Sequence, residues 1–109
     1  MASTYKVLGQ VNPAATTLTT LYTVPSATQS VASTLAICNQ GLVSTTVRVA
    51  IRPAGAALAA QHYIVFDSLV SANDTLFLTI GVSLATTDVV SVYAGTASVS
   101  FSLFGTEVA

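Results

Sequence analysis

Thr46-Val47-Arg48-Val49-Ala50-Ile51-Arg52 is the stretch of the sequence that decides the fold class. Along it, Val47, Val49 and Ile51 fall on one side of an extended chain, and the polar or small residues between them fall on the other. An alternation with a period of two is typical of a β-strand that is buried on one face only. We therefore expect a strand over Thr45–Arg52 with its apolar row against a core.

The same alternation recurs on both sides of this stretch. The other inward-facing rows that it predicts are Val99, Phe101 and Leu103; Leu76, Leu78 and Ile80; and Val31, Leu35 and Ile37, with Ser33 as a polar exception in the last row. Together these patterns predict about eight strands, at Tyr5–Val11, Leu18–Val24, Ser30–Asn39, Thr45–Arg52, Tyr63–Leu69, Thr75–Ile80, Val89–Ala94 and Ser98–Glu107.

Residues that favour turns separate the expected strands. Asn12-Pro13 and Pro25-Ser26 break the chain early, and Gly41 in Asn39-Gln40-Gly41 is free to adopt a positive φ. Further turns are expected at Ser71–Asp74 and at Gly95-Thr96, which reads as a short hairpin. Short strands at regular spacing in a chain of 109 residues predict one domain over residues 1–109, an all-β antiparallel sandwich. It is either a jelly roll or immunoglobulin-like, since both show the same local alternation.

The longest stretch without strand character is 53–61, which we expect to be a loop that crosses between the sheets. It is apolar, so it is either an interface loop or a packed connection over one end of the core. Arg48 and Arg52 share one face of the preceding strand, and arginine is the cation that best fits carboxylates across an interface. The candidate interface residues are therefore Arg48, Arg52, Gly55 and Leu58. The alternative for the two arginines is an exposed, solvated pair.

The composition is poor in charge. Hydrophobic residues make up 52% of the chain and charged residues 6%, whereas a soluble domain has about 25% charged residues. The apolar runs are only a few residues long, and a transmembrane helix needs about 20, so no membrane contact is predicted. Thr, Ser and Ala fill the surface instead. Either neighbouring chains cover much of that surface, or hydroxyl groups alone keep it soluble.

The polar residues do not suggest catalysis. The net charge of −1 gives no basic face for nucleic acid. His62 is the only histidine and Cys38 the only cysteine, so no metal site or disulfide is predicted, and Cys38 is expected to be a small buried apolar residue. His62 and Asp67 should face opposite sides of one strand, and there is no Gly-x-Ser-x-Gly element. We expect a protein without enzymatic activity or cofactor.

The acidic residues have a structural interpretation. Asp74 and Asp88 precede expected strands, where a carboxylate accepts hydrogen bonds from local backbone N–H groups. Carbohydrate binding stays an alternative because β-sandwiches often bind sugars, and Tyr5, Tyr22, Tyr63 and Tyr93 are available. The absence of Trp argues against it. The first residues lack the pattern of a secretion signal, which predicts synthesis in the cytoplasm.

Several segments in their order and spacing resemble a group of small virion structural proteins of tailed bacteriophages, including phages of cyanobacteria and marine bacteria. The segments that carry this resemblance, which spans nearly the whole chain, are Leu21–Pro25, Leu35–Asn39, Val47–Pro53, His62–Asp67, Ala72–Leu76, Thr87–Ala94 and Phe104–Glu107.

The resemblance implies a non-enzymatic β-sandwich protein located in the virion, with other virion proteins as partners. The first hypothesis is a decoration or cement protein bound to the major capsid protein, and the alternative in the same particle is a neck, tail or fibre component. A homo-oligomer is expected, with a trimer as one closed form. From another class, a module that binds the host surface or its glycans is the alternative.

Overall fold

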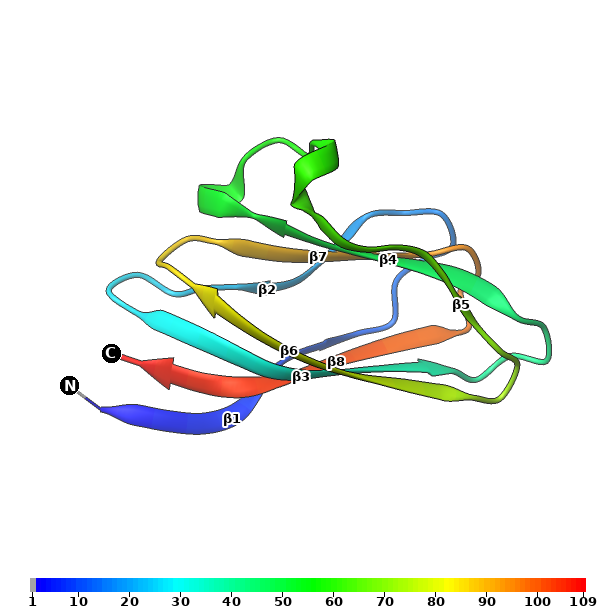
Figure 1. Cartoon of the computed structure of the whole chain (residues 1–109), viewed down its shortest axis with the longest axis horizontal. Helices are drawn as coiled ribbons and strands as arrows, with labels where there is room; N and C mark the ends of the chain where they lie inside the picture. Colours follow the sequence, from blue (N-terminus) through cyan, green and yellow to red (C-terminus); the bar gives the residue numbers. More distant parts are fainter. Residues whose placement is uncertain (1) are drawn as a thin grey trace.

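The computed structural model describes residues 2–109, which form two packed four-stranded antiparallel sheets (Figure 1). The strands are β1 (Ser3–Val11), β2 (Thr19–Thr23), β3 (Gln29–Asn39), β4 (Thr45–Arg52), β5 (Tyr63–Val70), β6 (Thr75–Leu84), β7 (Val89–Ala94) and β8 (Val99–Val108). Two 3₁₀ turns, η1 (Pro53–Gly55) and η2 (Ala60–His62), lie between β4 and β5. No helix in the described chain is long and apolar enough to cross a membrane.

The strand order identifies the sandwich as a jelly roll. Sheet A has the order β1-β8-β3-β6, and sheet B has the order β2-β7-β4-β5. Strands of the first half of the chain therefore pair with strands of the second half: β1 with β8, β2 with β7, β3 with β6 and β4 with β5. This is one long antiparallel ribbon rolled into two sheets, which is the jelly-roll arrangement. The immunoglobulin-like alternative does not have this order.

All eight expected strands are present, and most bounds agree within two residues. The exception is β6, which we expected to end at Ile80 and which continues to Leu84. Gly81 lies inside it with a φ of 56°, a conformation that glycine adopts without steric cost. It coincides with a shift in the pairing of β6 with β3, so β6 continues past an irregularity that the alternation pattern does not reveal.

A matching irregularity in β3 overturns one predicted face. The register of β3 shifts between Ala32 and Thr34 in both pairings, and against β8 Ser33 is the extra residue. As a result Ala32 is buried at 1% exposure, whereas Val31, which we expected to face inward, is 45% exposed. Cys38 was also expected to be buried, but it alternates with the buried Ile37 and Asn39 and lies partly exposed on the outer face.

Three connections differ from expectation. The 53–61 segment joins two neighbouring strands of sheet B, so it does not cross between the sheets. Conversely, Gly95-Thr96 is no hairpin, because it connects β7 of sheet B with β8 of sheet A. Gly41 does not have a positive φ. A Cβ at this position would instead lie 2.7 Å from the Ser98 hydroxyl oxygen, so close packing explains this glycine.

The core lies between the two sheets and is made by the central strands. Val47 and Val49 of β4 and Phe101 and Leu103 of β8 are fully buried, as the alternation predicts. Ala50, on the outer side of β4, is also fully buried, because it lies opposite the buried Ser91 of β7 where Arg52 and the turn after β4 cover sheet B. In β6, Leu84 is buried, but the inward-facing Leu76, Leu78, Ile80 and Val82 are only partly buried.

Asn39 connects the loops at the end of the sandwich away from the termini. Its side chain is 1% exposed, and its amide nitrogen donates to the carbonyl oxygens of Val43, Val70 and Ser71 at 3.0, 3.3 and 3.3 Å. Its amide oxygen accepts from the Gly41 N–H and from the Ser98 hydroxyl, both at 2.9 Å. One side chain therefore bonds to the β3–β4, β5–β6 and β7–β8 connections.

We expect Asn39→Ala to lower the free energy of unfolding by about 2–3 kcal/mol, because the backbone and hydroxyl groups that Asn39 binds, several of them buried, would lose their hydrogen-bond partner. Urea unfolding followed by circular dichroism measures this effect. Gln40→Ala is the matched control, since Gln40 is the exposed neighbour of Asn39 and its change should have little effect. Equal stability of the two variants would contradict the role given to Asn39.

Candidate interaction surfaces

The residues considered for catalysis do not come together. The His62 Nδ1 accepts a hydrogen bond from the Ala59 N–H at 3.1 Å, and Asp67 pairs with Arg48 on another part of sheet B. The described residues contain no group of three His, Cys, Asp or Glu side chains placed to hold a metal ion. As predicted, Asp74 and Asp88 accept backbone hydrogen bonds, from Thr75 in the first case and from Ala54 and Ala85 in the second.

Arg48 lies at the centre of a polar and aromatic cluster on the outer face of sheet B. Its Nε and Nη2 donate to the two carboxylate oxygens of Asp67 at 2.6 and 3.2 Å. Its guanidinium carbon lies 4.4 Å from the Phe66 ring centre and 4.6 Å from that of Tyr93. Tyr63 contacts the Phe66 ring edge to face at 4.9 Å. The hydrogen bonds between the ion pair raise the pKa of Arg48 and lower that of Asp67. Arg48 thus has its partner within its own chain.

Arg52 has a different role from Arg48, although the two residues share a strand. It donates to the Ala56 and Gly55 carbonyl oxygens at 2.8 and 3.2 Å, and to the Ser91 hydroxyl at 3.2 Å. These bonds hold the turn after β4 against sheet B, and Gly55 there has a φ of 70°. Leu58, farther along, is 39% exposed. Arg52 and Gly55 are therefore in contact with each other within the chain. The contact of this segment with another subunit stays a prediction.

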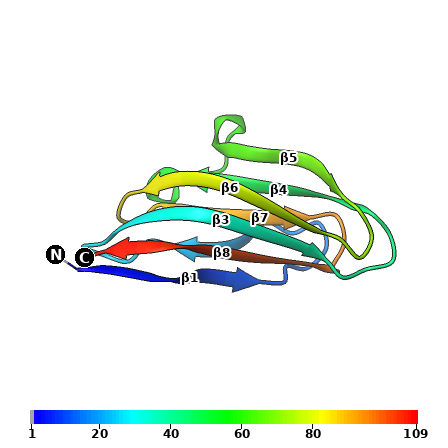
Figure 2. The same cartoon turned by 60° about the horizontal axis from the view of Figure 1, so that its bottom comes forward.

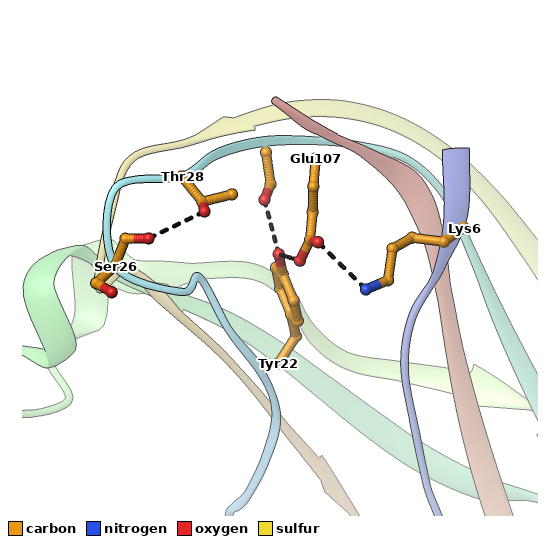
Figure 3. A network of polar contacts seen from close by, with 6 residues as sticks. Lys6, Tyr22, Ser26, Thr28 and Glu107 are labelled. Carbon is orange, nitrogen blue, oxygen red and sulfur yellow. Dashed lines mark hydrogen bonds and ion pairs between the residues drawn. The ribbon is translucent and has the colours of Figure 1, made fainter. Parts of the chain in front are cut away.

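A partly buried polar network at the other end of the sandwich was not predicted from the sequence (Figure 3). The Tyr22 hydroxyl of sheet B donates to a Glu107 carboxylate oxygen of sheet A at 2.6 Å. It also lies 2.7 Å from the Ser30 hydroxyl, which must donate because the single Tyr22 proton is already used. Lys6 binds the other Glu107 oxygen at 3.2 Å. The network therefore links β2 with β1, β3 and β8.

The ionisation of this network follows from its geometry. The hydrogen bond from Tyr22, and after it the contact with Lys6, lowers the pKa of Glu107 below its ordinary value of 4.5. Burial, reinforced by Glu107, raises the pKa of Tyr22 from 10.0 to about 12. Because the folded chain binds the Glu107 proton less tightly, the network adds stability at neutral pH that is lost as the pH falls below about 4.5.

The outer face of sheet A carries no charged side chain. We refer to fifteen outward residues, in four adjacent cross-strand rows, as the uncharged face. They are Tyr5, Thr106, Val31 and Ser83; Val7, Phe104, Thr34 and Thr79; Gln10, Ser102, Ala36 and Phe77; and Ser100, Cys38 and Thr75. Lys6 and Glu107 lie on the same strands, but they are paired with Gly105 and Ser30 on the inward side.

The uncharged face exposes several large apolar side chains. Tyr5 is 84% exposed and Phe77 is 68% exposed, and Val7 and Val31 are close to half exposed. Among them lie Ser and Thr side chains, whose hydroxyl groups can donate and accept hydrogen bonds and carry no charge. Four exposed apolar side chains on one sheet face without charge make this face a candidate for a protein–protein contact. Leu42 and Val43, exposed in the loop after β3, add a second apolar group at the end of the molecule.

A shallow hollow of about 420 Å³ lies at one end of sheet A, lined by residues that include Gln29, Val31, Ser83 and Val108. Asp88 is its only charged residue, and both carboxylate oxygens of Asp88 already accept backbone hydrogen bonds. Throughout residues 2–109, no buried polar side-chain atom lacks a hydrogen-bond partner. The polar interior groups thus have structural partners, and the exposed faces are the surfaces available for recognition.

No protein-family profile, curated protein or solved structure matches this chain.

We expect Tyr22→Phe to raise the pKa of Glu107 more than Lys6→Met does, because the Tyr22 hydrogen bond is the larger cause of its lowering. Carbon-13 NMR of the side-chain carboxyl group measures this pKa without ambiguity, since Glu107 is the only glutamate in the chain. If the Lys6 variant changed the pKa more than the Tyr22 variant, the carboxylate would depend on the ion pair instead.

Proposed function

We propose that this chain is a non-enzymatic structural protein of a tailed-phage virion, with a decoration or cement protein of the head as the first assignment. The observation that carries the proposal is the uncharged face, which spans all four strands of sheet A and exposes Tyr5, Val7, Val31 and Phe77. A soluble monomer normally keeps charge on such a surface to prevent association. A protein that stays bound to an assembly has no such need.

The fold and the use of the charges support this assignment. Jelly rolls are common in viral capsid proteins, although a fold by itself does not determine function. Both ion pairs lie within the chain, so the charges do not oppose packing against a neutral neighbour. The resemblance to small virion proteins of tailed phages points in the same direction.

The composition of purified particles tests the proposal. If the chain is a cement protein, quantitative mass spectrometry of virions whose genome encodes it will find it in a fixed ratio close to that of the major capsid protein. A few copies per particle would instead favour the neck, tail or fibre assignment. Its absence from gradient-purified particles would contradict both.

A charge on the uncharged face should block incorporation. Thr34 lies in a central row of this face. We expect Thr34→Glu to reduce the amount of the chain in assembled particles at least about tenfold, because the contact with the particle would bury a carboxylate that has no partner. Thr20→Glu on the exposed surface of β2 is the matched control and should be incorporated normally. Circular dichroism shows whether both variants are folded. Normal incorporation of a folded Thr34→Glu chain would argue against contact through this face.

The alternative from another class is a module that binds glycans on the host surface. The Arg48 cluster favours it, since it combines partly exposed aromatic rings with an Arg–Asp pair on sheet B. However, the guanidinium group already stacks on Phe66 and Tyr93, which occupies ring surface that a sugar would use. Binding of the purified chain to a glycan array, lost in Phe66→Ala, would favour this alternative.

A further inference from the structure

The outer edge of β6 differs from the other three sheet edges. An exposed strand edge is a template for pairing with another chain unless charge, bulges or short length block it. β1 carries Lys6 and a register shift, β2 has only five residues and a register shift, and β5 has two shifts and Asp67 at a φ of 52°. The 75–79 stretch of β6 pairs with β3 without a shift, and it contains no charged residue and no proline.

This stretch also reads the same in both directions. Its sequence is Thr75-Leu76-Phe77-Leu78-Thr79, a palindrome centred on Phe77. In an antiparallel pair related by a two-fold axis, one residue lies opposite itself and the others pair symmetrically about it. An axis at Phe77 therefore places Thr75 opposite Thr79, Leu76 opposite Leu78 and Phe77 opposite Phe77 of a second copy.

Each of these cross-strand pairs is a favourable one. Thr–Thr and aromatic–aromatic pairs are among those that stabilise antiparallel sheets. Phe77 is 68% exposed on the outer face, so its ring is free to contact its symmetry mate. Because the stretch has no charge, the two copies do not repel each other at the axis.

The inward side of β6 also lacks cover. Leu76, Leu78, Ile80 and Val82 pack against the core but stay partly exposed, whereas Phe101 and Leu103 of β8 are fully buried. β6 is the edge strand of sheet A, on the side opposite β1, and no further strand of that sheet lies beyond it (Figure 2). A strand added at this edge would cover part of that apolar row and would bind the free backbone groups.

We propose that the β6 edge binds the β6 edge of a second copy of this chain, with the two-fold axis at Phe77, to form a continuous eight-stranded sheet from the two copies of sheet A. This inference goes beyond the proposed function and does not depend on it, because it follows from the strand edge alone. A two-fold contact also differs from the trimer expected from the sequence.

Light scattering behind a sizing column tests the contact on the full chain. We expect the unmodified chain to form a dimer and Phe77→Lys to weaken that dimer at least about tenfold, because two lysines would lie side by side at the axis. Tyr5→Lys is the matched control: it adds the same charge to an exposed position of sheet A, at the opposite edge. It should leave the dimer intact.

Cross-linking tests the register independently of affinity. In a Cys38→Ser background, which removes the only native thiol, Phe77→Cys should form a disulfide between copies on mild oxidation, since directly opposite Cβ atoms lie about 5 Å apart. Thr79→Cys alone should not, because the two residues 79 would be separated by four residues of strand, about 13 Å. A mixture of Thr75→Cys and Thr79→Cys chains should cross-link.

Three outcomes would overturn the proposal. They are a monomer or a trimer of the unmodified chain at high concentration, a dimer that Phe77→Lys does not weaken, and cross-linking of Thr79→Cys as efficient as that of Phe77→Cys. A monomer or a trimer would mean that the β6 edge does not pair with a second copy and is available to a strand of a different protein. None of them bears on the presence of the chain in virions, which particle composition decides separately.

Discussion

The pairing of the first half of the chain with the second is the constraint on which the rest of the structure depends. Ser3 lies opposite Val108, and the pairing continues inward until β4 meets β5. Apart from β4 with β5, the strands therefore pair with residues far away in the sequence, and folds with such non-local pairings fold slowly. A polar side chain strengthens each end of the roll. Tyr22 links β2 to Glu107 beside the termini, and Asn39 bonds to three connections at the opposite end.

The few charged residues are used within the chain, which explains how a domain with 6% charge leaves a whole sheet face neutral. Lys6 pairs with Glu107 and Arg48 with Asp67, while Arg52, Asp74 and Asp88 bond to backbone groups of neighbouring turns. Each charge thereby stabilises a junction between elements. What is left for the outer face of sheet A is hydroxyl groups and apolar side chains, a surface suited to contact with other neutral protein.

The sequence predicts well what depends on neighbours along the chain and poorly what depends on distant partners. The inward rows around Val47 and Phe101 follow from alternation alone, because a strand with one buried face must alternate. Val31 was assigned to the wrong face because one extra residue, Ser33, reverses the alternation, and its cause lies in the pairing with other strands. The Tyr22–Glu107 contact joins residues 85 apart, so no local pattern reveals it. Asn39 shows the same limit, since its position suggests a turn residue and its buried bonds reach loops distant in sequence.

An unprotected strand edge with the sequence of β6 calls for a physical explanation, because such edges usually lead to aggregation. A head-to-tail contact would leave a free edge on every new copy, and chains would continue to add. A two-fold contact between identical edges differs, since each β6 is occupied by the other and neither is left to bind a third chain. The remaining edges at β1, β2 and β5 are interrupted by register shifts, by short length or by charge. A palindromic edge on an otherwise protected sandwich therefore supports a closed dimer. In this dimer, the apolar residues of β6 that would otherwise drive fibre growth are buried in one symmetric contact.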